Sequence, residues 1–316
     1  MLKHLFRRTC IAIPTLLLVV TIVFFLMRMI PGSPAQYILM GEDVTPEDIE
    51  ALEEVLGLND PIPVQYFRFL GDIATGNWGN SYIYEEPVFE RMLAKWEPAI
   101  FMAIMATVVT VVIAFPVGIL SATHRNSIGD YITTTGAIAM QSIPTICWSL
   151  LLIYFLGFKL RIFKTGGYDY IADKGFWRAV YSITLPSLAL GLHHVAGQVR
   201  YVRTTMLDVL NQDYVRTAKS KGLPQYKVYY KHALRNTMNI TASMVISSFV
   251  SMLGGTAVTE KAFSISGLGT LGLQALSLRD YPQEQAVVIW ASTISVLLSL
   301  FMDVFYYWLD PRIKYE

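Results

Sequence analysis

The chain has 316 residues, of which 53% are apolar and only 16% are charged, and its formal net charge is +1. A soluble domain usually carries about 25% charged residues, so this composition excludes an ordinary soluble globular protein. The balanced charge argues against nucleic acid as a partner. The two cysteines, Cys10 and Cys147, lie inside apolar runs and suggest neither a disulfide framework nor a metal or redox pair.

Apolar residues gather in segments that are long enough to cross a bilayer. A hydrocarbon core about 30 Å thick needs roughly 20 mostly apolar residues in a helix. The predicted transmembrane helices span residues 9–30, 99–122, 131–157, 183–205, 238–259 and 287–309. The sequence therefore predicts an all-α integral membrane protein with six transmembrane helices.

These segments also define the expected domain organisation. Residues 1–30 form an N-terminal cytoplasmic segment and the first transmembrane helix, and residues 31–98 form an extracytoplasmic loop. Residues 99–309 form a five-helix core that contains a cytoplasmic loop at 206–237, and residues 310–316 form a cytoplasmic tail.

The basic residues favour an orientation with both termini in the cytoplasm. In that orientation the inside segments hold 14 of the 25 Lys and Arg residues. The stretch 32–97 contains 13 acidic residues and three basic ones, which suits the outer face. Short, Lys- and Arg-rich flanks on the cytoplasmic side are what the positive-inside rule requires.

The outer loop is predicted to be partly helical. Thr45 is a suitable N-cap, Pro46 suits the first helical position, and acidic residues occupy the first turn. Gly57 is a suitable stop. A second helical pattern runs over 64–73, so this loop is either a lid packed on the membrane helices, a docking surface for an external partner, or both.

The sequence shows no motif that is typical of an enzyme active site. The five histidines are scattered, without an H-E-x-x-H pattern, and neither a phosphate-binding P-loop motif nor a G-x-S-x-G elbow occurs. The chain is therefore predicted not to be an enzyme and to carry no cofactor, so any ATP would be bound by another polypeptide.

The cytoplasmic loop between the fourth and fifth predicted spans carries the most information. Residues 213–220 read as a short amphipathic helix with Tyr214, Val215 and Ala218 toward one side. Gly222 can end this helix in a left-handed conformation, and Pro224 can open the next one. From physical chemistry alone, this loop is equally well a docking helix for a partner or a basic loop that merely obeys the positive-inside rule.

The segment from Leu207 to Asn236 closely resembles the permease signature of binding-protein-dependent ABC importers. More narrowly, the chain resembles the B-type subunit of the oligopeptide/dipeptide/nickel branch. The stretches 13–35, 57–66, 263–282 and 309–312 extend this resemblance over nearly the whole chain. Arg216-Thr217-Ala218 stands where the wider superfamily has Glu-Ala-Ala, and Ile240, at the start of the fifth span, stands where the branch usually has proline.

The resemblance implies a type I ABC importer permease fold in a bacterial or archaeal cytoplasmic membrane. Its implied partners are a homologous C-type permease subunit, two ATPase subunits that bind ATP and Mg²⁺, an extracytoplasmic solute-binding protein and a peptide substrate. Carried over residue by residue, it also implies a coupling helix seated in an ATPase cleft. The coupling residues would be Asp213, Tyr214, Arg216, Thr217, Ala218, Lys219, Lys221, Gly222 and Leu223.

Polar residues inside the predicted spans are candidates for the translocation pathway or its gate. They are Gln141, Ser142, Ser243, Ser247, Ser251 and Glu260. The serines can line a wet pathway or let two helices approach closely, and ionisable groups in spans usually face protein or water. A proline-containing break at 141–144 is a further candidate.

Two other classes of function stay open. An ion-coupled secondary transporter would need inverted repeats and paired buried carboxylates. An intramembrane enzyme would need a catalytic pair. Within the importer class, peptides are favoured over nickel or sugars by the family resemblance alone.

Overall fold

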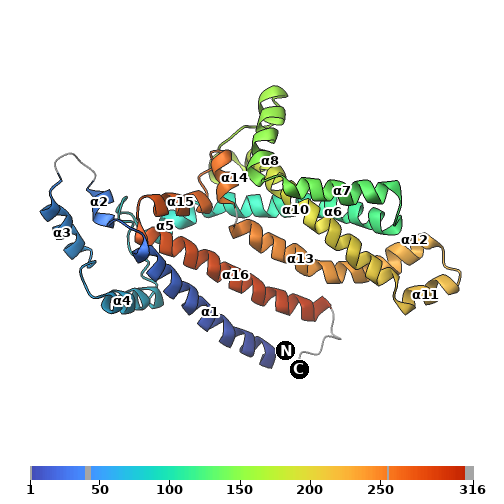
Figure 1. Cartoon of the computed structure of the whole chain (residues 1–316), viewed down its shortest axis with the longest axis horizontal. Helices are drawn as coiled ribbons and strands as arrows, with labels where there is room; N and C mark the ends of the chain where they lie inside the picture. The colour runs from blue at the N-terminus through green and yellow to red at the C-terminus, as the bar shows by residue number, and fades with distance from the viewer. Residues whose placement is uncertain (1, 40–43, 255, 310–316) are drawn as a thin grey trace. The chain divides into compact units, whose positions relative to one another are not determined.

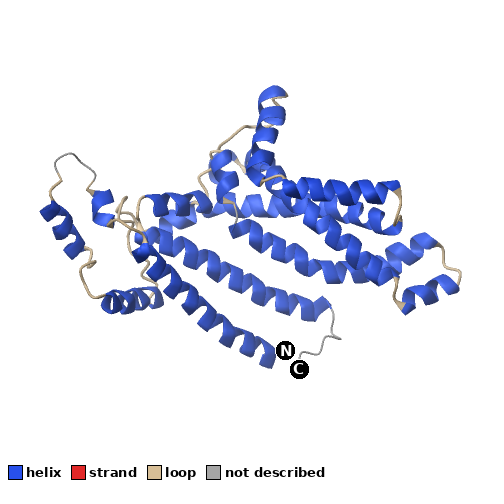
Figure 2. Cartoon of the chain, in the orientation of Figure 1, coloured by secondary structure: helices blue, strands red, loops and turns tan. Residues whose placement is uncertain are grey.

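The computed structural model describes residues 2–39, 44–254 and 256–309, and every regular element within these ranges is a helix (Figure 2). The predicted all-α class is confirmed. The predicted tail, 310–316, lies outside the described residues. The chain divides into two compact units, which we call unit 1 (Met1–Glu97 with Gly267–Leu300) and unit 2 (Pro98–Ser266 with Phe301–Glu316).

Unit 1 combines helices from the two ends of the sequence (Figure 1). They are α1 (Leu2–Met29), α2 (Pro34–Ile38), α3 (Pro46–Val55), α4 (Ile62–Ala74), α5 (Val88–Ala94), α15 (Leu268–Ser277) and most of α16 (Tyr281–Leu309). The stretch after α1 contains helices α2, α3, α4 and α5. Its start signal is present as a capping box, in which Thr45 and Asp48 bond each other's backbone N–H groups. Gly57 follows the end of α3 with φ of +65°.

Aromatic side chains hold α4 against α1 within unit 1. Phe24 is completely buried. Its ring centroid lies 5.2 Å from that of Tyr66 and 5.4 Å from that of Phe69. The Thr21 and Tyr66 hydroxyl groups share a hydrogen bond of 2.7 Å. Helix α4 is therefore anchored on α1 by aromatic packing, and the hydroxyl group of Tyr66 is paired by a hydrogen bond.

Unit 2 contains the central part of the chain. Its elements are α6 (Trp96–Thr123, except its first two residues), α7 (Ile128–Ser142), α8 (Thr145–Leu152), the π-helix η1 (Ile153–Lys159), α9 (Ile171–Lys174), α10 (Phe176–Leu210), α11 (Asp213–Ser220), α12 (Gln225–Lys227), the π-helix η2 (Val228–Ala233), α13 (Leu234–Gly254) and α14 (Ala257–Ala262). Long α10 packs against α7, α8 and α13 and organises this unit.

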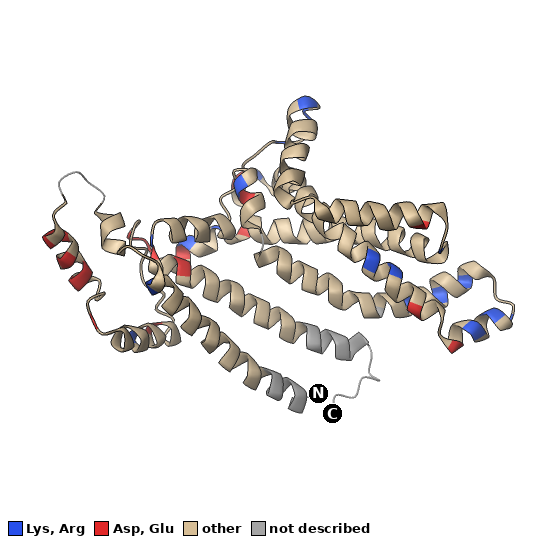
Figure 3. Cartoon of the chain, in the orientation of Figure 1, with Lys and Arg blue, Asp and Glu red and all other residues tan. Residues whose placement is uncertain are grey.

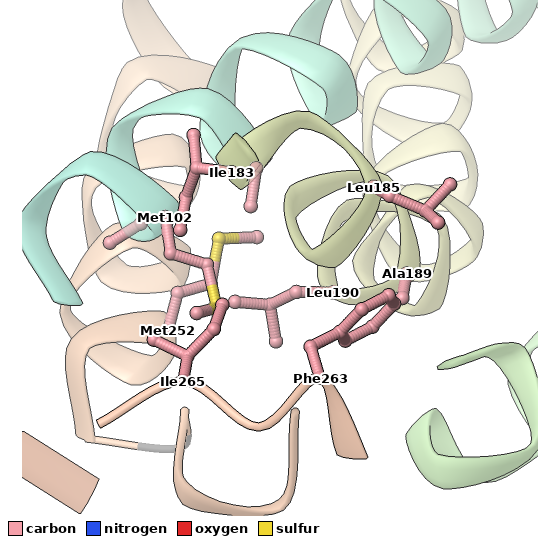
Figure 4. Packing of buried hydrophobic residues seen from close by; sticks show 10 residues of the cluster. Met102, Ile183, Leu185, Ala189, Leu190, Met252, Phe263 and Ile265 are labelled. Atoms are coloured by element: carbon pink, nitrogen blue, oxygen red, sulfur yellow. The ribbon is translucent and has the colours of Figure 1, made fainter. Parts of the chain in front are cut away.

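The core of unit 2 forms where α6, α10 and α13 meet the segment after α14. Figure 4 shows Met102, Ile183, Leu190 and Met252 packed with Phe263, and all five are at least 97% buried. Small residues allow the backbones of these helices to approach closely, as is usual between membrane helices.

Two glycines, Gly118 of α6 and Gly191 of α10, let these helices approach closely, and a β-carbon on Gly118 would lie 2.9 Å from the Val199 carbonyl oxygen. A β-carbon placed on Gly191 would lie only 2.9 Å from the Ala106 carbonyl oxygen. The Thr110 hydroxyl donates to the Gly191 carbonyl oxygen at 3.1 Å across the same contact.

Among the described residues, three helical stretches are long and apolar enough to cross a membrane: Thr9–Met29, Val88–Thr123 (α5 with α6) and Tyr281–Phe301. Two bent helix pairs raise the number to five if each pair is one span. The predicted count of six is not confirmed. The segment 183–205 lies inside α10, a 35-residue helix whose polar side chains, including Arg200 and Arg203, dilute its apolar character.

The two bent pairs change the shape of predicted spans three and five. The segment 131–157 breaks by 96° between α7 and α8, and Pro144 precedes α8 at this break. The proline-containing break predicted at 141–144 is thus present. The helix pair over 225–254 bends by 46° at the start of the predicted span 238–259. The helix that follows the bend ends at Gly254.

Candidate functional site

The candidate coupling segment, residues 213–223, begins three residues after α10 ends at Leu210 (Figure 1). Its helix α11 has Asp213 in the first turn and Lys219 in the last turn, charges that suit the helix dipole. Val215 and Ala218, three residues apart, share one face and pack on Val228 of η2. The amphipathic helix predicted from the sequence is therefore present, and its apolar face is turned toward the chain itself.

Gly222 ends α11 in a left-handed conformation, with φ of +73°. Its N–H donates to the Lys219 carbonyl oxygen at 2.9 Å, and the Leu223 N–H donates to the Ala218 carbonyl oxygen at 3.4 Å. This pair of bonds is a Schellman motif, and the apolar contact that usually accompanies it is the packing of Leu223 in the Val215 and Ala218 cluster. A β-carbon on Gly222 would meet no atom within 4 Å, so the backbone conformation alone requires glycine here.

The chain then turns back toward α13. Pro224 is extended, with ψ of 143°, and α12 begins at Gln225, one residue later than the position predicted for this helix start. The π-helix η2 leads from α12 into α13. The Asn236 Nδ2 atom donates to the Tyr214 hydroxyl at 2.7 Å, which ties α11 to the start of α13.

The outer face of this segment is basic and exposed. Figure 3 shows Lys and Arg residues gathered over α11, α12 and the adjoining end of α10. Arg216 and Asp213 approach to 3.8 Å, but their side chains are 71% and 99% exposed, so this ion pair contributes little to stability. The positive charge is therefore available to a partner surface.

The predicted coupling residues divide into an outer and an inner set. Ala218 is buried and Leu223 is half-buried, so both act in the internal packing. The exposed ones are Asp213, Tyr214, Arg216, Thr217, Lys219, Lys221 and Gly222. Their role in coupling stays a prediction.

The predicted pathway residues fall on three elements. Gln141 and Ser142 lie exposed at the end of α7, where the Gln141 Oε1 atom accepts a hydrogen bond from Arg200. The three serines, Ser243, Ser247 and Ser251, lie along α13, and the Ser243 hydroxyl donates to a carbonyl oxygen of its own helix at 2.7 Å. Their place along a pathway stays a prediction.

Glu260, the sixth pathway candidate, lies in α14 and is completely buried. It accepts a hydrogen bond of 2.7 Å from the Thr256 hydroxyl. In this arrangement its carboxylate serves the packing of α14 and does not contact solvent. Among the described residues, no group of three His, Cys, Asp or Glu side chains could hold a metal ion.

A buried ion pair between α10 and α7 was not predicted from the sequence. Arg203 of α10 donates from Nε and Nη2 to the two carboxylate oxygens of Asp130 at 2.6 and 2.7 Å. Ser121 of α6 and the Asn126 N–H also donate to this carboxylate. Asp130 is only 4% exposed. The available signal was the presence of ionisable residues in or beside predicted spans, because such residues are usually paired.

Comparison with known proteins defines the class of this chain. Residues 114–315 match the family of binding-protein-dependent transport system inner membrane components, and residues 1–114 match the N-terminal model of such membrane components. The chain therefore belongs to this family. At the family level it is a membrane permease component of an importer and not an enzyme.

Similar proteins within the family have related names. The chain is 35% identical over 318 residues to the oligopeptide transport system permease protein AppB of Bacillus subtilis, with full coverage of both chains. It is 36% identical over 334 residues to the dipeptide transport system permease protein DppB of Alkalihalophilus pseudofirmus, again with full coverage. It is 33% identical over 316 residues, also with full coverage, to the glutathione transport system permease protein GsiC of Escherichia coli K12.

The fold matches a solved importer. A chain of the MetNI methionine ABC transporter, in an inward-facing conformation, aligns with 71% of this chain and 99% of its own length, with a TM-score of 0.58 and 15% identity. The type I ABC importer permease fold expected from the sequence is thus the fold of this chain.

Proposed function

We propose that this chain is the B-type permease subunit of an ATP-driven peptide importer, and that residues 213–223 couple it to an ATPase. The relatives with full coverage are named for oligopeptide, dipeptide and glutathione transport, which supports a peptide substrate. A homologous C-type permease completes the pore, and an extracytoplasmic solute-binding protein delivers the peptide. ATP and Mg²⁺ bind to two separate ATPase subunits.

The membrane arrangement is part of this proposal. Six spans with both termini in the cytoplasm require α10 to cross the membrane despite its polar residues. Its partners support this, because Arg203 is neutralised by Asp130 and Arg200 donates to Gln141. Polar groups within a span are tolerated when they are paired inside the protein. The basic face of α11 and α12 then lies in the cytoplasm, where the positive-inside rule favours it.

The Schellman turn at Gly222 is the observation that carries the coupling role. It holds α11 in a fixed orientation to η2 and α13. A partner that displaces the exposed face of α11 therefore also displaces α13, because these elements move as one rigid body. Closure of the ATPase pair on ATP binding turns the two permeases outward-open, and hydrolysis resets the inward-open state. Such transmission is a rigid-body change between two arrangements.

A paired substitution tests this role. Gly222→Val puts a β-branched residue into a left-handed conformation, at a cost of about 1–2 kcal/mol, at a position where an added β-carbon meets no atom within 4 Å. We expect peptide uptake per ATP hydrolysed to fall about tenfold, since 1.4 kcal/mol corresponds to a factor of ten. Gly222→Asn is the control, because asparagine tolerates this conformation. Uptake and peptide-stimulated hydrolysis that are equal in the two variants would show that the turn does not transmit the signal.

Purification tests the assembly. The tagged chain, extracted in mild detergent from its native host, is expected to carry one homologous permease, ATPase subunits and a solute-binding protein, each identified by mass. The solute released from the binding protein is expected to be a peptide. A chain that purifies alone, with uptake that persists after ATP depletion, would exclude the importer assembly.

A further inference from the structure

Unit 1 contains a cavity of about 240 Å³ beside the end of α1. The last turn of α1, helix α4, the segment 77–82 and the first turns of α16 line it. The apolar runs Thr9–Met29 and Tyr281–Phe301 end or begin here, so the cavity lies at the ends of two candidate membrane spans.

Arg28 brings an uncompensated positive charge to this cavity. Its guanidinium carbon lies 3.5 Å from the centre of the Phe24 ring and 5.9 Å from that of Tyr281. Its Nε donates to the Gln65 Oε1 atom at 2.9 Å, and Nη1 donates to the Phe24 carbonyl oxygen at 3.3 Å. No carboxylate of the described residues forms an ion pair with it. A half-buried guanidinium without a counter-ion is costly, because its partners here are neutral.

The position of Arg28 is fixed by a second set of contacts. Gln65 is 92% buried, since its exposed fraction is 8%, and its Nε2 atom donates to the carbonyl oxygens of Leu58 and Asp60, both at 2.8 Å. The amide therefore has one available orientation, in which its oxygen faces Arg28. The charge is held in place before any ligand arrives, as a preorganised binding site requires.

A residue of the same lining also keeps a buried donor without a partner. Gln285 is only 5% exposed and lines the cavity, and its Nε2 atom has no hydrogen-bond partner among the described residues. Most buried side-chain donors in native proteins are paired, so an orphaned amide indicates a missing acceptor.

The other charged residues of the lining do not supply that acceptor. Arg68 is paired with Asp60 at 2.5 Å, and the Asp72 carboxylate accepts from Asn77 at 3.2 Å. Among the described residues, Arg28 is therefore the arginine of the lining that forms no ion pair, and Asp72, the one carboxylate of the lining, accepts from an amide and not from Arg28.

We propose that this cavity binds a small oxyanion, a carboxylate or a phosphate, through an ion pair with Arg28 and a hydrogen bond from Gln285. Guanidinium groups match the geometry of both anions and bind them with charge-assisted hydrogen bonds. At the ends of two candidate membrane spans, the oxyanion comes either from a free solute or from the phosphate of a lipid headgroup. This site is independent of the transport role, and uptake assays test that role separately.

Free anions are the first probe. The purified complex is titrated with sodium phosphate or sodium acetate against sodium chloride at constant ionic strength, and the thermal unfolding midpoint is recorded. A ligand that binds only the folded state raises this midpoint in a saturable way. We expect Arg28→Gln to weaken the apparent affinity at least tenfold and Gln285→Leu to weaken it three- to tenfold, with partial retention in Arg28→Lys.

Arg68→Gln is the matched control, because it removes a positive charge from the same cavity lining but leaves Arg28 intact. This variant should bind like the wild type. An equal loss in both variants would mean that general charge attraction, and not a site at Arg28, causes the effect, and would overturn the proposal. Midpoints measured in chloride alone establish that each variant is folded.

Lipid is the second probe. The complex is reconstituted in nanodiscs of phosphatidylglycerol or phosphatidylcholine, and the lipids retained after release are counted by native mass spectrometry. We expect the wild type and Arg68→Gln each to retain one phosphatidylglycerol that Arg28→Gln loses. This result would identify a lipid headgroup as the source of the bound oxyanion. Absence of any Arg28-dependent anion or lipid binding in both experiments would overturn the proposal.

Discussion

Arg203 in unit 2 and Arg28 in unit 1 are two partly buried arginines in opposite situations. Arg203 meets a carboxylate with two hydrogen bonds, and that carboxylate accepts two further ones. Arg28 meets two aromatic rings, an amide and a carbonyl group, all neutral. The charge of Arg203 is paired with a carboxylate of the chain, whereas the charge of Arg28 has no such partner among the described residues.

The same difference extends to the helices around them. Between residues 279 and 290 of unit 1, five side chains keep a buried polar atom without a partner: Arg279, Gln283, Glu284, Gln285 and Trp290. In unit 2, this holds for Gln198 and Thr259 among the described residues. Unit 2 is therefore largely complete as folded, whereas the start of α16 retains polar groups that suit binding.

Removal of the Asp130 carboxylate should produce the largest effect. Asp130→Ala leaves Arg203 partly buried without its counter-ion. We expect the free energy of unfolding to fall by about 3 kcal/mol, the lower end for a broken buried pair, because Arg203 is still 22% exposed. Denaturant titration in detergent measures this change. Asp208→Ala, an exposed aspartate on the same α10, is the control and should change the stability by less than about 0.5 kcal/mol.

Arg28→Gln sharpens this contrast in the same titration. It removes a hydrogen bond to Gln65 but strands no carboxylate, so the expected loss is about 1 kcal/mol. A loss as large as that of Asp130→Ala would mean that Arg28 is a structural residue like Arg203, and the distinction between the two would fail.

Close packing inside unit 2 is tested by one substitution at two positions of α10. Gly191→Ala places a methyl group 2.9 Å from the Ala106 carbonyl oxygen, so α6 and α10 must separate, at about 1–3 kcal/mol. Gly197→Ala meets no atom within 4 Å and should stabilise the helix by about 0.5–1 kcal/mol. Thermal unfolding of the two variants shows whether their changes in stability have opposite signs. If both variants gain stability, the contact between α6 and α10 is looser than described.

The smallest effect is expected at a more exposed ion pair of unit 2. Lys174 and Lys164 donate to Asp169 at 2.8 and 2.9 Å and hold the pKa of its carboxyl group below the ordinary value. Because the folded-state pKa is lowered, the stabilisation is fully present above the unfolded pKa of about 4 and is lost as the pH falls through the folded-state value. Because the Lys164 side chain is 35% exposed and the Lys174 side chain is 53% exposed, it amounts to less than about 1 kcal/mol.

Asp169→Asn should abolish that acid-side loss. Thermal unfolding midpoints between pH 7 and pH 3 measure the difference between this variant and the wild type. Parallel curves for the two proteins would mean that the lysines do not stabilise Asp169 in the folded state.

The sequence by itself determined the helical membrane class, the family and the local signals at helix ends. Apolar run length indicates membrane helices because the bilayer fixes the required length. Thr45 and Gly222 were identified because capping and left-handed turns depend on a few neighbouring residues.

Only the tertiary structure decided the features that depend on distant residues. The ion pair between Asp130 and Arg203 joins positions 73 residues apart, and the cavity at Arg28 brings together α1, α4 and α16. The burial of Ala218 against Val228 likewise turned a predicted contact residue inward. No local pattern encodes these contacts, because which charge finds a partner and which remains unpaired is settled when helices from different parts of the chain pack together.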